Sequence, residues 1–454
     1  MRSAVRHCRQ DPCHRPPVAG GMLRLAAGLL VLILAACAAP GGPPAGQARA
    51  PSVGEKLPAA SGSESKATRL ARTSEPIPIA LLLPMTGEAD EVGRALEHAA
   101  RLAFFDAYDP RLHLLVFDTG GKPEGAARAA QLARDAGVKA AVGPLLADGV
   151  RAAAPILMQA GIPTLALSSD RRTGRPGIWP IGFAPEEETA RILSYAARHG
   201  LRRLGVLLPE TPYGDRVALG LAESLHRTPL EVVASARYRP DPDLLSGPVR
   251  RLARYDERHA AWKAEMAFLE SMDDDLSNEI RAGLEHRETI GGVGFDALLL
   301  AEGDPLIRTL APLVAFYEID PAEVRLLGTG LWDDPAVLRE PNLNGAWFSA
   351  PDPAPPRALL RRLEIAFGEP APRIATLAYD AVSLIALLAR EPVVSRRLTV
   401  SAFIDRHGFL GVDGPFRLFA DGRVQRHLAV IEIGGRRFRV IDPPRPAFEA
   451  APVS

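Results

Sequence analysis

Short apolar runs that alternate with helical patterns constrain the fold of this chain more than any other feature. From residue 77 onward, runs that indicate buried strands (residues 77–84 and 112–117 are the first two) alternate with segments whose apolar residues recur at helical spacing (residues 88–107 and 123–135). Strands that alternate with helices of this length predict β-α-β units, right-handed crossovers and a parallel sheet. We therefore expect an α/β fold.

The alternation is long enough for two doubly wound lobes within residues 77–441. We expect the first lobe to comprise residues of about 77–183 and 329–400, and the second to comprise residues of about 184–328 with part of 401–441. Residues 243–288 interrupt the second lobe with two amphipathic stripes, which predict a helical insertion. Asp421-Gly422 and Gly434-Gly435 favour tight hairpin turns and a small antiparallel meander, and residues 442–454 form a tail.

The first 36 residues have the features of a secretory signal. Arg24 precedes an apolar run of 12 residues that ends in Leu34-Ala35-Ala36-Cys37. This run is shorter than the roughly 20 residues that a membrane span needs. We expect a signal peptide over residues 1–36, with Met22 as the candidate true start. Leu-Ala-Ala-Cys resembles the lipobox of bacterial prolipoproteins, which implies cleavage before Cys37 and acylation of Cys37. The alternative is an ordinary signal peptide that happens to contain a cysteine.

The residues after this signal predict a lipidated flexible tether over residues 37–76. They are rich in Pro, Gly, Ala and Ser and have no apolar period. After cleavage, Cys37 is the only cysteine that remains. The processed chain therefore has no second thiol with which to form an internal disulfide.

The charge balance and the missing motifs exclude several classes of function. Without residues 1–36 the chain has 49 basic and 53 acidic residues and no basic patch, so we expect no nucleic-acid partner. The motifs G-x-x-x-x-G-K-S/T, H-E-x-x-H and G-x-S-x-G are absent from the sequence. Glu186-Glu187-Glu188 begins a predicted helix, where acidic residues favour the helix dipole. We predict no enzymatic activity, no metal and no cofactor.

Open α/β sheets bind ligands beyond the carboxyl ends of their strands. In this chain the segments that follow the predicted strands contain small, hydroxyl and aromatic residues, and the helices after them begin with free N–H groups. These features predict a small-molecule cleft between the lobes. The alternative is that each residue only caps a helix or forms a turn. The candidate cleft residues are Thr86, Gly87, Thr119, Pro144, Leu145, Ser168, Ser169, Tyr213, Glu302, Gly303 and Trp332.

Several motifs, in chain order, resemble a known superfamily. Residues 79–87 (IALLLPMTG), Val142-Gly143-Pro144 and Tyr379-Asp380-Ala381 resemble type I periplasmic binding proteins of the Leu/Ile/Val-binding kind. Within that superfamily, residues 327–332 (LGTGLW), residues 408–414 (GFLGVDG) and the long insertion resemble lipoproteins called penicillin-binding protein activators. The resemblance covers roughly residues 77–441. It implies two parallel-sheet lobes of the type I periplasmic binding protein fold.

The activator resemblance implies a non-catalytic regulator of peptidoglycan synthesis. Such lipoproteins lie on the periplasmic face of the outer membrane and activate a class A penicillin-binding protein by direct contact. Ala38, rather than an aspartate, follows Cys37, which implies the outer membrane. Two departures stand out: only residues 38–76 occupy the place of a helical-repeat domain, and Leu145-Leu146-Ala147 replaces the serine-rich loop with which amino-acid-binding members hold a carboxylate.

Two hypotheses about function follow. The first is the envelope regulator, with the insertion 243–288 as one candidate contact surface for the synthase. The alternative is a substrate-binding lipoprotein of an ABC transporter that takes an amino acid, a peptide or a related small molecule in the interlobe cleft.

The lipid anchor gives a first prediction. Cys37→Ala removes the sulfur that carries the lipid, so we expect it to abolish palmitate labelling of the chain and to block lipoprotein processing. Labelling with radioactive palmitate, followed by gel analysis, measures both effects. Labelling that persists in the Cys37→Ala chain would show that the anchor lies elsewhere.

Overall fold

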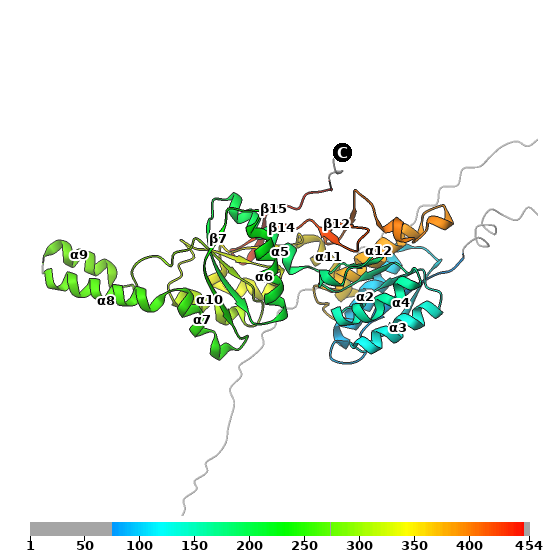
Figure 1. The fold of residues 1–454 in the computed structure, drawn as a ribbon, viewed down its shortest axis with the longest axis horizontal. Coiled ribbons are helices and arrows are strands. Elements are labelled where there is room, and N and C mark those ends of the chain that lie inside the picture. Colours follow the sequence, from blue (N-terminus) through cyan, green and yellow to red (C-terminus); the bar gives the residue numbers. More distant parts are fainter. Residues whose placement is uncertain (1–74, 273, 449–454) are drawn as a thin grey trace, which may run out of the picture. The chain divides into compact units, whose positions relative to one another are not determined.

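A computed structural model describes residues 75–272 and 274–448 of the chain. The predicted signal peptide, Cys37 and the tether up to residue 74 lie outside these residues, as does the end of the predicted tail. The described residues form two lobes, each built on a sheet with parallel strands, and one small antiparallel sheet (Figure 1). The predicted α/β class, with two parallel-sheet lobes and a helical insertion in the second, is confirmed.

Lobe 1 contains a five-stranded sheet in the order β2-β1-β3-β4-β5, in which all neighbours are parallel. Its strands are β1 (Ile77–Leu83), β2 (Leu112–Asp118), β3 (Ala140–Val142), β4 (Thr164–Ala166) and β5 (Ile178–Pro180). Its helices are α2 (Asp90–Ala107), α3 (Pro123–Asp135), α4 (Ala147–Gln159), α11 (Ala354–Phe367) and α12 (Ala375–Ala389).

Strand β1 shows why this sheet is covered on both faces. Successive side chains of a strand point to opposite faces. Ile79, Leu81 and Leu83 accordingly pack in one hydrophobic core, and Ala80 and Leu82 pack in another. Both cores need covering helices, which is why the strand is an almost continuous apolar run rather than an alternating one.

Lobe 2 contains a seven-stranded sheet in the order β15-β14-β10-β9-β8-β6-β7. The part from β7 to β10 is parallel, and β14 and β15 extend it as antiparallel strands. Its strands are β6 (Arg203–Pro209), β7 (Glu231–Tyr238), β8 (Ala297–Leu300), β9 (Arg325–Gly328), β10 (Trp347–Ala350), β14 (Ala429–Gly434) and β15 (Arg437–Asp442). Its helices include α5 (Pro185–Arg198), α6 (Pro212–Leu225), α7 (Ser246–Leu252) and α10 (Ile307–Phe316).

The boundary between the lobes differs from the one expected. Residues 329–350 belong to lobe 2 and not to lobe 1, because β10 pairs with β9 and β14 and because Trp332, Val337 and Phe348 pack in the core of lobe 2. Short 3-10 turns connect β9 to β10, and such turns leave little periodic pattern in the sequence. The third sheet, of β11 (Phe409–Gly411), β12 (Gly414–Leu418) and β13 (Val424–Arg426), packs on the core of lobe 1.

The predicted insertion has two different parts. Helix α7 is part of lobe 2, since Leu245, Val249 and Leu252 of the predicted stripe lie in its core. Helices α8 (Tyr255–Met272) and α9 (Asp275–Leu284) form a hairpin that projects beyond the sheet of lobe 2 (Figure 1). In this hairpin Leu269 is buried, whereas Leu276 and Ile280 of the second predicted stripe are exposed. No helix among the described residues is both long and apolar enough to cross a membrane.

The chain passes between the lobes three times: between β5 and α5, between β10 and α11, and between β13 and β14. Arg426, on the third crossing, donates hydrogen bonds to the backbone oxygens of Ile181 and Asp413, both at 3.2 Å. The ring of Phe183, on the first crossing, packs against the guanidinium groups of Arg426 and Arg373, which lie 5.5 and 4.9 Å from its centre. We call Phe183, Arg373, Asp413 and Arg426 the crossing cluster.

Candidate functional site

The carboxyl edge of the lobe 1 sheet is organised around Asp118, at the end of β2. Its carboxylate accepts hydrogen bonds from the backbone N–H groups of Met85, Thr86 and Gly120, at 2.7–3.3 Å, and from the Thr86 hydroxyl at 2.7 Å. Partial burial raises the pKa of Asp118, but these hydrogen bonds outweigh it and hold the pKa below the ordinary value of a carboxyl. The hydroxyl of Thr86, a predicted cleft residue, is therefore bonded to Asp118 within lobe 1.

Other predicted residues of lobe 1 are likewise engaged within the lobe. Thr119 is buried, and its backbone N–H donates to the Leu83 oxygen at 2.9 Å. The Ser168 hydroxyl accepts from the Asp170 N–H at 3.1 Å. Leu145 packs against the core of lobe 1. Among the predicted residues of lobe 1, and within the part of the chain that the structure describes, only Ser169 forms a hydrogen bond to the other lobe.

The carboxyl edge of lobe 2 holds a second group of predicted residues. The Tyr213 hydroxyl and the Thr329 hydroxyl are hydrogen-bonded at 2.7 Å, and the Tyr238 hydroxyl donates to the Glu302 carboxylate at 2.7 Å. The Gly303 N–H also donates to Glu302, at 3.0 Å. Burial raises the pKa of Tyr213 well above its usual value, so its hydroxyl keeps its proton.

Trp332 is a core residue rather than a lining residue of a cleft. It is fully buried, and its indole N–H donates to the Glu302 backbone oxygen at 2.8 Å. Its ring lies so close to Gly328 that a Cβ there would meet a ring carbon at 2.3 Å. The sequence placed Trp332 just after a strand, but an aromatic ring at that position fills the lobe's own core.

Five side chains join the two lobes and are called the cross-lobe cluster: Ser169, Arg171, Glu186, Arg216 and Glu223. Arg216 of α6 donates to both carboxylate oxygens of Glu186, at 3.0 and 2.7 Å, and to the Ser169 hydroxyl of lobe 1 at 3.1 Å. It also donates to the backbone oxygen of Ser169. Arg171 of lobe 1 pairs with Glu223 of α6 and lies 3.6 Å from Glu186. The loops at the strand ends of both lobes are therefore in contact.

Glu188 is a buried carboxyl group beside this cluster. Its only hydrogen bond from the described backbone comes from the Gly330 N–H at 3.0 Å. A Cβ at position 330 would lie 2.4 Å from the Glu188 carboxylate, so only glycine permits this approach. Burial raises the pKa of Glu188 to about 8, against the lowering effect of the Gly330 hydrogen bond. The group is mostly protonated at pH 7.

Sequence reasoning missed Glu186, Glu188, Arg171 and Arg216. The three glutamates do begin α5, as expected, but Glu186 and Glu188 are almost fully buried, which a helix-dipole role does not require. The run of three acidic residues directly after Pro185, at a lobe boundary, could have indicated a site. Charged residues that are buried at such a boundary nearly always have a specific partner. The sequence contained no sign of which arginine would pair with them.

Comparisons with known proteins bear on the fold of the chain. Residues 76–256 match the family model described as Periplasmic binding protein, which is less than half of the chain. No curated protein gives a significant match.

Solved structures match over most of the described residues. A putative branched-chain amino acid ABC transporter protein from Rhodospirillum rubrum has a TM-score of 0.63 at 18% identity, over 81% of this chain and 100% of that one. A substrate-binding protein of a branched-chain amino acid transporter from Streptococcus pneumoniae, in complex with isoleucine, has a TM-score of 0.53 at 16% identity, over 81% and 100%. A solute-binding protein from Rhodopseudomonas palustris BisB5, in complex with 3,4-dihydroxybenzoic acid, has a TM-score of 0.56 at 15% identity. This match covers 83% of this chain and 98% of that one.

The chain has the fold of a type I periplasmic binding protein. The predicted superfamily resemblance is supported in this respect. In this fold class the strand ends of two lobes face a common cleft, which is the general position of ligands in open α/β sheets. The cross-lobe cluster and Glu188 lie at that position.

The protonation of Glu188 makes stability depend on pH. Because its pKa is about 8 in the folded chain and near 4.5 when unfolded, the folded state holds the proton more tightly, and stability falls as pH rises from 5 to 8. Glu188→Gln keeps a neutral acceptor for Gly330. We expect the wild-type chain to lose on the order of 4 kcal/mol more than Glu188→Gln over this range.

Urea denaturation at pH 5, 6, 7 and 8 measures this difference. Glu285→Gln, at an exposed position after α9, is the matched control and should follow the wild-type pH dependence. Parallel pH profiles for wild type and Glu188→Gln would show that Glu188 is ionised in the folded chain.

Proposed function

We propose that this protein is an envelope receptor that binds a small organic molecule between its two lobes and acts by binding rather than by catalysis. The observation that carries the proposal is the contact between strand-end loops of both lobes through Ser169, Arg216 and Glu186. A molecule held there touches both lobes at once, and its binding free energy is gained only when the lobes adopt one relative arrangement. The family match over residues 76–256 and the fold support membership of the periplasmic binding protein family.

The chemistry of the two edges describes the ligand further. Lobe 1 has Leu145 and Leu146 after Gly143-Pro144, and it offers apolar surface rather than hydroxyls there, since Leu146 is exposed. The edge of lobe 2 carries the hydroxyl of the half-buried Tyr213, which is bonded to the buried Thr329, and the largely protonated Glu188 is buried close by. We infer a ligand with an apolar part against lobe 1 and hydrogen-bonding groups against lobe 2. The ligands bound in two of the compared structures, isoleucine and 3,4-dihydroxybenzoic acid, both combine these features.

Thermal-shift measurements test this proposal. The panel is leucine, isoleucine, benzoate, 3,4-dihydroxybenzoate, short peptides and muropeptides. A ligand that binds only the folded state raises Tm by mass action, and we expect at least one member to do so. Tyr213→Phe removes one hydroxyl at the lobe 2 edge and should weaken that ligand about tenfold.

The matched control is Tyr255→Phe, which removes a hydroxyl bonded to Glu288 near the base of the α8–α9 hairpin. It should leave the ligand-induced shift unchanged. A flat response of the wild-type chain to the whole panel would count against a receptor function.

A second candidate function has its own observation. The α8–α9 hairpin exposes four large apolar side chains, Phe268, Met272, Leu276 and Ile280, each more than two-fifths accessible. Exposed apolar side chains grouped in this way are typical of protein contact surfaces. They support the hypothesis that the protein, anchored through Cys37 at the outer membrane, is a penicillin-binding protein activator that regulates a class A penicillin-binding protein.

This candidate is tested with the class A penicillin-binding proteins of the same cell. If the hairpin is the contact, the chain should retain one of them in a pull-down and accelerate its glycan polymerisation. Phe268→Glu and Leu276→Glu should reduce both effects at least tenfold, because a charge would then be buried in the contact. Ile365→Glu, at an exposed apolar position of α11, is the matched control. No retention and no rate change would rule out the regulator.

A further inference from the structure

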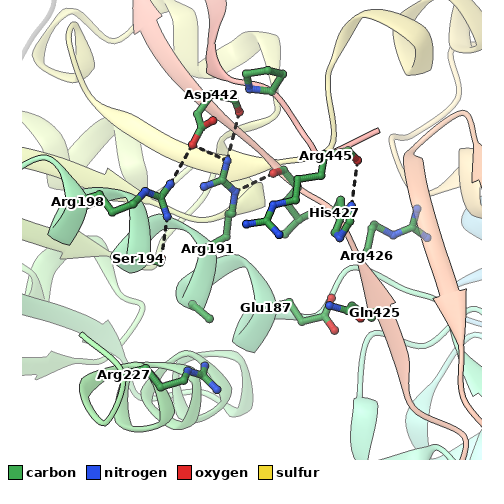
Figure 2. A pocket seen from close by; sticks show the side chains of 13 residues that line it. Glu187, Arg191, Ser194, Arg198, Arg227, Gln425, Arg426, His427, Asp442 and Arg445 are labelled. Atoms are coloured by element: carbon green, nitrogen blue, oxygen red, sulfur yellow. Dashed lines mark hydrogen bonds and ion pairs between the residues drawn. The ribbon is translucent and has the colours of Figure 1, made fainter. Parts of the chain in front are cut away.

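A cavity rich in arginine lies apart from the strand-end loops. It has a volume of about 570 Å³ and is lined by α5, by Arg227 just after α6 and by the segments 425–428 and 442–445 (Figure 2). This volume is in the range of small-molecule sites. The residues that line it contain none of the predicted cleft residues.

The cavity is strongly electropositive. Five arginines line it (Arg191, Arg198, Arg227, Arg426 and Arg445), against two acidic residues, Glu187 and Asp442. Burial raises the pKa of Glu187 to about 7 in spite of Arg426, so this carboxyl carries a reduced charge at neutral pH. Burial and nearby arginines also lower the pKa of His427, even though its ring is hydrogen-bonded to the Arg445 oxygen.

The carboxylate of Asp442 already binds two of the arginines that line the cavity. Asp442 lies 3.0 Å from the guanidinium nitrogens of both Arg191 and Arg198. Arg191 is itself fixed by a hydrogen bond to the Leu428 backbone oxygen at 2.8 Å. Two guanidinium groups of the cavity therefore already bind one carboxylate group. Planar guanidinium groups bind carboxylate and phosphate oxygens well.

Two arginines of the cavity have no such partner. Within residues 75–272 and 274–448, neither Arg227 nor Arg445 forms an ion pair, and both side chains are exposed. In the view of Figure 2, Asp442 lies at one side of the cavity and Arg227 at the other, so the cavity between them is lined by charge on both sides.

We propose that this cavity is a second binding site, for a small organic anion that carries phosphate or carboxylate groups. Arg227 and Arg445 would pair with the anionic groups, and Arg191, held by Asp442 and by the Leu428 backbone oxygen, would line the site beside them. The apolar parts of Ala190, Leu428 and Pro443 would contact the carbon skeleton. Residues 425–428 connect the small antiparallel sheet on lobe 1 to β14 of lobe 2. A bound anion would therefore connect the third crossing to α5 and would restrict the movement of the lobes relative to each other.

Isothermal titration of the full chain with pyrophosphate and with citrate tests the proposal. We expect binding of at least one of them that weakens as salt concentration rises, since exposed charges are screened. Arg227→Ala and Arg445→Ala should each weaken it about tenfold, the usual effect of losing a charge-assisted hydrogen bond. The matched control is Arg437→Ala, an exposed arginine of β15 outside the cavity, which should bind as the wild type does.

Two results would overturn the proposal. The first is the absence of binding of both anions at millimolar concentration. The second is binding that Arg227→Ala and Arg445→Ala leave unchanged, which would place the anions elsewhere on the chain. Neither result affects the interlobe cleft, because none of these arginines belongs to the strand-end loops.

Discussion

The crossing cluster is the interaction on which the arrangement of the rest depends. Arg426 bonds the backbone of the first crossing at Ile181, and Arg373 pairs with Asp413 at 2.7 Å and with Asp333 of lobe 2 at 2.8 Å. Asp413 is fully buried, so its charge requires Arg373. Lobe 1, lobe 2 and the small antiparallel sheet are thus joined by one set of charged side chains, and the ring of Phe183 packs against the two arginines of that set.

This cluster explains why the functional residues lie where they do. Because only residues 181–184 connect β5 to α5, Glu186 and Glu188 at the start of α5 lie next to the strand-end loops of both lobes. Glu186 is compensated by Arg216, whereas Glu188 has no arginine within ion-pair distance among the described residues and is neutralised by its own proton. Glu187 lines the arginine-rich cavity instead. Three consecutive glutamates therefore have three different surroundings, because they lie where the two lobes and the cavity meet.

The fold could be predicted from the sequence because its signals are local. Buried parallel strands produce apolar runs, and β1, which supplies two cores, is the clearest example. The lobe boundary at residues 329–350 could not be predicted, since it depends on the pairing of β10 with β14, about 80 residues later in the chain. The same limit applies to the site. Positions such as Tyr213 and Ser169 follow from strand ends, but whether a hydroxyl is free, as opposed to bonded to Asp118 as in Thr86, depends on partners from distant segments.

We propose that a small molecule binds between the lobes and fixes their relative arrangement. The most direct test is the distance between spin labels at Glu88→Cys and Glu210→Cys, two exposed positions beside strand ends of lobe 1 and lobe 2, in a chain whose three native cysteines are replaced by serine. Pulsed electron paramagnetic resonance gives this distance with and without the compound that raises Tm most. We expect a shorter and narrower distance distribution with the compound bound. A distribution that stays unchanged while the compound is bound would contradict it.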